Sequence, residues 1–211
     1  MTVIDDWSNI IGIMKRTDKR SELIRVGSEI IAQRGFKSAS LNDILSTAGV
    51  PKGSFYYYFS SKDDFGLAII DDFAAQYRDR LKHLLDDVQF SPLSRLRNYF
   101  ELKIADMEAG DCTDGCLIGN LAQELSAQNE LFRLRLNKVF ADWEEYFLKC
   151  LQAASEVGEI SQNSNLDDLA RFILSSWEGA ILQAKVSKSI VPMQTFVDIL
   201  FHQVLGKYPD R

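Results

Sequence analysis

The sequence has few cysteines, few histidines and no long apolar run. Three cysteines and two histidines in 211 residues argue against a disulfide framework. No apolar stretch approaches the roughly 18 residues that a membrane-spanning helix requires, and no basic and then apolar leader precedes a cleavage site. We therefore expect neither a membrane span nor secretion, and the low cysteine content fits the reducing cytoplasm.

The residues of common catalytic and metal sites are equally scarce. The histidines are His83 and His202, and no Gly-x-Ser-x-Gly motif is present, so the sequence offers no nucleophile–base pair. Cys112 and Cys116 are close enough in the chain to share a metal ion, but no second pair of ligands lies nearby. We therefore expect no enzymatic activity, no metal and no cofactor.

The charge is divided unevenly along a chain of ordinary globular composition. Hydrophobic residues make up 46% and charged residues 26% of the sequence, and the formal net charge is −6. Residues 1–60 hold eight Lys and Arg against six Asp and Glu, which leaves 16 of the 24 basic and 24 of the 30 acidic residues for the remainder. A basic N-terminal segment on an acidic body is the asymmetry expected of a DNA-binding regulator.

The stretch SLNDILSTAGVPKGSFYYYFSSKDD, which starts at Ser40, predicts two short helices joined by a turn. Ser40 can cap the first helix, and Gly49 can end it in the left-handed backbone conformation. Pro51 suits the start of the second helix, where its missing N–H would have had no partner. The first helix has one apolar face at helical spacing, formed by Leu41, Ile44, Leu45 and Ala48.

The second short helix, at about 51–59, has an unusual aromatic content. Phe55 and Phe59 are four residues apart and can both face inward, whereas three consecutive tyrosines cannot all be buried on one helix. A lysine and several hydroxyls suit the edges of bases and the phosphates of DNA. The side chains expected to point outward are Lys52, Ser54, Tyr57 and Tyr58.

The segment AGVPKGSFYYYFSSKDDF resembles the signature of TetR-type transcriptional regulators, and the match extends upstream through Arg34-Gly35-Phe36. The resemblance implies an all-α protein with an N-terminal three-helix helix-turn-helix DNA-binding domain and a C-terminal helical ligand-binding and dimerisation domain. It places the helix-turn-helix at 40–59, and we place the two domains at 17–77 and 78–211.

The chemistry of the side chains suggests roles within the helix-turn-helix. Gly53 would allow close approach to DNA rather than make a contact itself. We expect groove contacts from Lys52, Ser54 and Tyr57, and phosphate contacts from Ser40, Tyr58 and Lys62.

Apolar periodicity predicts helices through most of the remaining chain, after a loose arm at residues 1–16. The expected helices are 18–35, 61–87, 91–109, 117–127, 130–154, 166–187 and a last one from Pro192. In the resembled family the last two long helices form the interface of a homodimer. The residues expected there are Trp177, Ala180, Ile181, Ala184, Phe196, Leu200 and Phe201.

The segment GCLIGNLAQELS resembles the electrophile-responsive subgroup of TetR-type repressors, which respond to N-ethylmaleimide or acrylate. The resemblance implies that Cys116 is the reactive thiol and that Lys185 approaches it. A helix N-terminus and a nearby ammonium both lower the pKa of a thiol, which would favour the nucleophilic thiolate. The alternative is an inert, buried cysteine beside a pocket for an unreactive molecule, and the sequence leaves both open.

These expectations combine into a dimeric repressor that binds double-stranded operator DNA and is released by a small-molecule or electrophilic effector. The competing interpretation is a helical interaction module that has lost DNA binding. The intact polar residues of the helix-turn-helix argue against it, namely Lys52, Gly53, Ser54, Tyr57 and Lys62.

Overall fold

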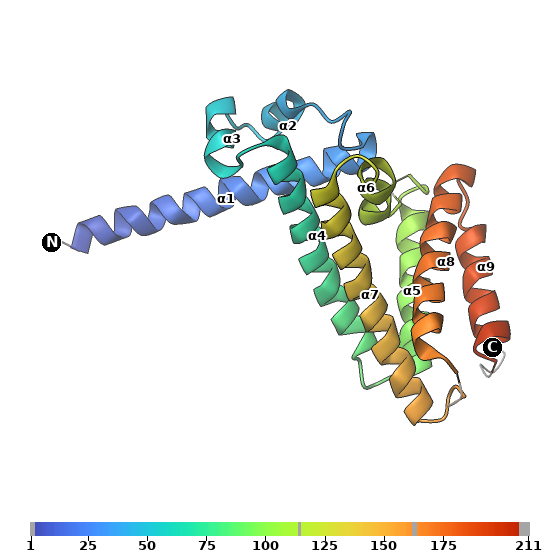
Figure 1. Cartoon of the computed structure of the whole chain (residues 1–211). Helices are drawn as coiled ribbons and strands as arrows, with labels where there is room; N and C mark the ends of the chain where they lie inside the picture. The colour runs from blue at the N-terminus through green and yellow to red at the C-terminus, as the bar shows by residue number, and fades with distance from the viewer. Residues whose placement is uncertain (1–2, 114, 162–163, 207–211) are drawn as a thin grey trace. The chain divides into compact units, whose positions relative to one another are not determined.

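The structure is a computed structural model that describes residues 3–113, 115–161 and 164–206, with side chains from Lys19 onward. The described residues form helices joined by short connections, with no strand among them, so the expected all-α fold is confirmed (Figure 1). The chain divides into two compact units, of which unit 1 ends at Phe73 and unit 2 begins at Ala74. No helix in the described ranges has both the length and the apolar composition needed to cross a membrane.

Unit 1 contains α1 (Val3–Arg34), α2 (Leu41–Thr47), α3 (Lys52–Tyr58) and the first half of α4 (Lys62–Leu85). The loose arm expected at residues 1–16 is wrong for 3–16, because α1 is continuous from Val3. These residues contain no proline. A helix that is already nucleated further along the chain can extend through them at little cost, even without an apolar period of their own.

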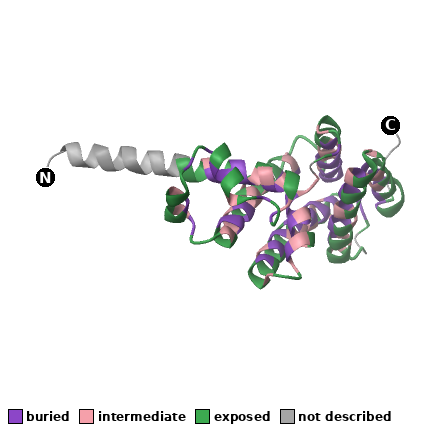
Figure 2. Ribbon diagram, turned by 90° about the horizontal axis from the view of Figure 1, so that it is seen from above, coloured by how far each residue is buried: buried purple, intermediate pink, exposed green. Residues whose placement is uncertain are grey.

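The core of unit 1 is built from side chains of all four helices. Gly27 of α1 lies where a Cβ atom would collide with the ring of Phe65, so the absent side chain lets that ring pack directly against the α1 backbone. Figure 2 shows the buried residues on the inward faces of the helices. The fully buried members include Leu23, Ile44, Phe55, Phe65, Ile69 and Ile70.

Unit 2 contains the second half of α4 and five further α-helices. Side-chain caps fix the starts of two of them: Asn129 Oδ1 accepts the Leu131 N–H at 3.0 Å, and Asn165 Oδ1 accepts the Asp168 N–H at 3.3 Å. The last helical element among the described residues is a π-helical turn, η1 (Leu200–Val204). The five helices are α5 (Pro92–Ala109), α6 (Leu117–Leu125), α7 (Glu130–Glu156), α8 (Leu166–Ser187) and α9 (Val191–Ile199).

Aromatic rings from four helices form the centre of unit 2. The Phe100 ring centroid lies 4.7 Å from that of Trp177, 5.9 Å from that of Phe147 and 5.2 Å from that of Phe196. Helix α7 packs on both α5 and α8, and α8 packs on α9 (Figure 1). These rings therefore belong to one continuous core.

Candidate functional site

The helix-turn-helix of unit 1 is organised by local signals in the sequence. Ser40 caps α2, because its Oγ accepts the Asn42 N–H at 3.2 Å. Gly49 has a φ of 62°, a left-handed conformation that only glycine adopts without strain, and it turns the chain towards α3. Phe55 and Phe59 are buried as expected, and their ring centroids are 5.4 Å apart.

The outward face of α3 carries polar and aromatic side chains. Lys52 is exposed, and Tyr57 is 57% exposed, while Ser54 and Tyr58 are half-buried. Tyr56, which the sequence analysis did not select, is as exposed as Tyr57, since its ring meets the buried Phe55 ring only edge-on. This face therefore presents one ammonium and two phenol hydroxyls to any ligand of unit 1.

Lys62, at the first position of α4, holds the loop that precedes α2. Its Nζ donates to the Phe36 carbonyl at 2.7 Å and to the Lys37 carbonyl at 3.5 Å, and it lies 4.8 Å from the centroid of the Phe36 ring. The ammonium therefore has a structural role within unit 1, in addition to any contact with phosphate.

Replacing Lys62 with alanine should lower the free energy of unfolding by about 1–2 kcal/mol, because a charge-assisted hydrogen bond and a cation–π contact are lost. Denaturant unfolding measures this, with the exposed Lys52→Ala as a matched control that should change stability by less than about 0.5 kcal/mol. Equal stability of the two variants would contradict the structural role. If Lys62 also contacts a phosphate, the same variant should reduce the salt dependence of DNA binding by about one unit.

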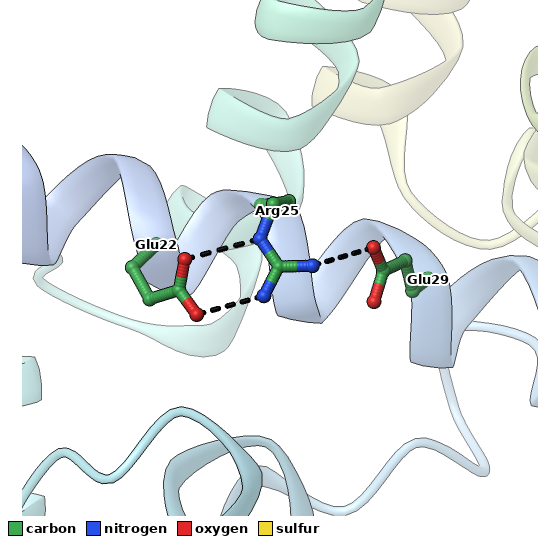
Figure 3. A network of polar contacts seen from close by, with 3 residues as sticks. All are labelled: Glu22, Arg25 and Glu29. Atoms are coloured by element: carbon green, nitrogen blue, oxygen red, sulfur yellow. Dashed lines mark hydrogen bonds and ion pairs between the residues drawn. The ribbon is translucent and has the colours of Figure 1, made fainter.

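The exposed face of α1 carries a closed network of charges. Arg25 donates from Nη2 to Glu22 Oε1 at 2.7 Å and from Nη1 to Glu29 Oε1 at 2.7 Å (Figure 3). Two carboxylates thus share one guanidinium, and the trio has a net negative charge. This part of α1 is consequently unsuited to a phosphate backbone.

In unit 2, Cys116 lies directly before α6 and caps it. Its Sγ accepts the Gly119 N–H at 3.4 Å. The residue is partly exposed, but protein atoms surround the thiol, and its pKa is raised well above the ordinary value by burial and by the nearby Glu178 carboxylate. The helix N–H acts in the opposite direction and does not prevail. The environment therefore favours the neutral thiol, as in the buried cysteine that was one of the two alternatives left open by the sequence.

Glu178, on α8, is the functional candidate that the sequence analysis missed. Its carboxylate is a neighbour of Cys116, since the place of a Cβ atom on Gly119 adjoins both Glu178 Oε2 and the Cys116 Cβ, and burial raises the pKa of the carboxyl to about 7. A Cβ atom on Gly119 would collide with Glu178 Oε2, so this glycine provides the space for the carboxylate beside the start of α6. A signal was present in the sequence, since Glu178 lies at helical spacing between the apolar Leu174 and Ile181.

Two tyrosines complete a polar cluster around Glu178 and Cys116, in which Tyr99 is buried and Tyr77, Cys116 and Glu178 are half-buried. The Tyr77 and Tyr99 hydroxyls are 2.6 Å apart, and burial raises the pKa of both phenols. Trp177 is 1% exposed, and its indole N–H is close enough to lower the pKa of the Tyr99 phenol. This N–H nevertheless forms no hydrogen bond of good geometry with the described residues. We call Tyr77, Tyr99, Cys116, Trp177 and Glu178 the polar cluster.

A cavity of about 160 Å³ is lined by neighbours of the polar cluster: Gly115 precedes Cys116, and Lys103 lies 5.5 Å from the centroid of the Tyr77 ring. The stem of Lys185 passes close to this place, since its Cδ would be 3.3 Å from a Cβ atom on Gly115. The structure thus brings Lys185 next to the residue that precedes Cys116. The lining residues of the cavity are Lys103, Asp106, Met107, Gly110, Gly115, Ile181 and Met193.

The side chains expected to form a dimer interface lie inside the single chain. Trp177, Ala184, Leu200 and Phe201 are no more than 1% exposed, since they pack in the core of unit 2. Ala180 and Ile181 are also buried, and Phe196 is half-buried against Phe100. Periodicity identified a buried stripe correctly, and within the described residues that stripe packs against other helices of unit 2.

Among the described residues, no group of three or more His, Cys, Asp or Glu side chains could hold a metal ion. The two candidate functional sites are the outward face of α3 in unit 1 and the polar cluster in unit 2. Such a capped helix-turn-helix with exposed lysine and tyrosines is the hallmark of a DNA-binding protein.

Comparison with known proteins defines the family. Residues 23–69 match the model of bacterial regulatory proteins of the tetR family, and residues 92–200 match the tetracyclin repressor-like C-terminal domain. The chain is 35% identical over 192 residues to the HTH-type transcriptional repressor DhaR of Mycobacterium sp. strain GP1, covering 91% of this chain and 95% of that protein. It is 37% identical over 174 residues to the transcriptional regulator AcuR of Cereibacter sphaeroides, covering 82% and 80%.

A solved structure gives the same result. The crystal structure of the reduced form of NemR from Escherichia coli superposes with a TM-score of 0.81 at 31% identity, covering 85% of this chain and 93% of that chain. The chain belongs to the TetR family and is similar to its electrophile-responsive subgroup. It is a DNA-binding transcriptional regulator and not an enzyme.

Proposed function

We propose that the protein is a dimeric cytoplasmic repressor that binds a palindromic operator and leaves it when an effector reacts or binds at the polar cluster. The single observation that supports this best is the pairing, in one chain, of an exposed α3 face with a half-buried thiol–carboxylate pair whose neighbour Gly115 lines a cavity. Each helix-turn-helix would enter a major groove, with half-sites about 34–36 Å apart.

The DNA contacts follow from the exposure of side chains around α3. Lys52, Ser54 and Tyr57 would reach base edges in the groove, and Gly53, where a Cβ atom would meet open space, allows close approach. Tyr56 joins this set because it is equally exposed. The phosphate contacts are assigned to Ser40, Tyr58 and Lys62, all of which can donate from a hydroxyl or ammonium.

The dimer interface is proposed on the exposed face of α8 rather than on the side chains that the sequence suggested. That face has large apolar residues separated by small ones, which lets two helices approach closely. Leu182, in its middle, is 41% exposed. The stripe runs at helical spacing through Phe172, Ser175, Gly179, Leu182 and Val186.

Replacing Leu182 with arginine should convert the protein to a monomer and weaken operator binding by at least about 100-fold, because one protomer then binds a single half-site without the avidity of two. Light scattering after size exclusion gives the mass, and titration of operator DNA gives the affinity. Leu134→Arg, at a 52%-exposed position on α7, is the matched control and should remain dimeric. A dimeric Leu182→Arg protein would contradict this interface.

The effector would act through the polar cluster, either by forming a bond with Cys116 or by filling the adjoining cavity without one. The names of the relatives identify repressors, and one structure concerns a reduced form, which fits thiol chemistry in that protein. Tyr77 of the cluster lies on α4, and α4 continues into unit 1. A change at the cluster can therefore bias a two-state regulator through a helix that both units share.

A further inference from the structure

We propose that Glu178 is the base that accepts the Cys116 thiol proton when this thiol adds to an electron-poor alkene, and the acid that returns the proton to carbon. The inference deepens the proposed function, since it rests on Cys116 as the sensing thiol. It assigns a role to a carboxylate of α8 that stands beside a neutral thiol at the start of α6.

The geometry places donor and acceptor together. The missing side chain of Gly119 leaves room for Glu178 Oε2, and a Cβ atom at this place would be 3.5 Å from the Cys116 Cβ, so the thiol and the carboxylate are neighbours. A thiol in this environment is a poor nucleophile unless its proton is removed as the sulfur attacks, because the thiolate is the reactive form. A neighbouring carboxylate is the group that can remove it.

The step balances without any further reactant. As the sulfur–carbon bond forms at the β-carbon of the alkene, the S–H proton moves to the Glu178 carboxylate, and the π electrons move to the activating carbonyl as an enolate. The carboxylic acid then protonates the α-carbon, so that Glu178 is again ionised and one saturated thioether results. The Cys116 bond to carbon is the only lasting change in the protein.

The residues around Glu178 include a hydrogen-bond donor for the enolate oxygen, and a cavity nearby has room for the reagent. The Trp177 N–H of the same cluster has no hydrogen-bond partner among the described residues, and such a donor stabilises a developing oxyanion. Lys103 approaches from α5, with its Nζ 5.5 Å from the centroid of the Tyr77 ring, and it lines the adjoining cavity. A small unsaturated carbonyl compound fits a cavity of about 160 Å³.

The groups that face Glu178 determine how the rate should depend on pH. They are Tyr77 from α4, Tyr99 and Lys103 from α5, and Cys116 before α6, while Lys185 lies further along α8. Burial raises the pKa of Glu178 to about 7, so the carboxylate is protonated and inactive as a base below this pH and available above it. The rate of adduct formation should rise through neutral pH as Glu178 ionises.

The test is the rate of N-ethylmaleimide addition to Cys116, followed by peptide mass spectrometry of the full-length protein between pH 5.5 and 9. Glu178→Gln should react at least about tenfold more slowly at pH 8 and lose the inflection near neutral pH, because the amide cannot accept the proton. Glu178→Asp should restore part of the rate and the inflection. Asp167→Asn removes an exposed carboxylate from the same helix and should react like the wild type.

Whether Glu178→Gln reacts more slowly or faster than the wild type decides between a base and a carboxylate that only repels the thiolate. If the carboxylate only repels the thiolate, Glu178→Gln reacts faster than the wild type, and that result overturns the inference while Cys116 remains the sensing thiol. An unchanged rate in a folded Glu178→Gln protein overturns it equally. If Cys116 of the folded wild type does not react at any pH, the covalent form of the proposed function fails, and the role of Glu178 fails with it.

Discussion

Replacing Phe55 with alanine should abolish DNA binding by unfolding unit 1. The side chain is 0% exposed, and its ring centroid lies 5.4 Å from that of Phe59 and 5.5 Å from that of Phe65. Truncation of a fully buried phenylalanine costs about 3–5 kcal/mol, since apolar burial is lost and a cavity remains. A small unit with one compact core has a low free energy of unfolding, and this loss is comparable to that entire free energy.

The measurement is urea unfolding followed by circular dichroism, together with titration of operator DNA. Tyr57→Ala is the matched control on the same helix: the side chain is 57% exposed, and its removal should change stability by less than about 0.5 kcal/mol. That control should still weaken operator binding, because the phenol lies on the proposed contact face. A stable, DNA-binding Phe55→Ala protein would contradict the assignment of Phe55 to the core.

The helix-turn-helix was predictable from the sequence because its signals are local. Ser40 caps α2, Gly49 has the left-handed conformation that ends it, and the spacing of Phe55 and Phe59 places both rings inside. Each of these features depends on residues within a few positions, and the sequence displays them directly.

The chemistry of unit 2 was not predictable in the same way. The start of the helix after Cys116 is a local feature and was predicted, but the pKa of the thiol depends on Glu178, which is distant in the sequence and adjacent only in the fold. Burial and this carboxylate together raise the pKa, whereas a helix terminus and a lysine alone would have lowered it. Contacts between residues that are distant in the sequence therefore determine that the pKa of the Cys116 thiol is raised and not lowered.

The α8 helix shows a second limit of periodicity. Its apolar stripe through Trp177 and Ala184 was predicted correctly, but periodicity shows only which face is buried and not which helix or partner packs against it. In the structure α7 and α9 cover it, and a different face, with Phe172, Leu182 and Val186, remains exposed. Helix α1 is a third case, because its extension to Val3 follows from cooperativity and not from any pattern of side chains.

Replacing Cys116 with serine should remove the response to thiol reagents without removing operator binding. The variant keeps an oxygen that can cap α6 in place of Sγ, and the α3 face is in the other unit. An adduct on the wild-type thiol would place new atoms beside Glu178 and the Tyr77 and Tyr99 pair, and it would remove the thiol proton that Glu178 accepts. A chemical change at this cluster can bias a regulator between two states.

Cys150→Ser is the matched control for this variant. The Cys150 thiol is buried, donates to the Pro92 carbonyl at 3.2 Å, and has its pKa raised to about 12 by burial. It should therefore stay unreactive in the folded protein, and its loss should leave the response to a thiol reagent intact.

The decisive measurement is the affinity for DNA from beside the protein's own gene, titrated with and without N-ethylmaleimide, for the wild type, Cys116→Ser and Cys150→Ser. We expect the reagent to weaken binding by the wild type and by Cys150→Ser at least about tenfold, which corresponds to a coupling of about 1.4 kcal/mol. Cys116→Ser should bind equally well under both conditions. Equal release of Cys116→Ser, or no release of the wild type despite a Cys116 adduct, would contradict the account.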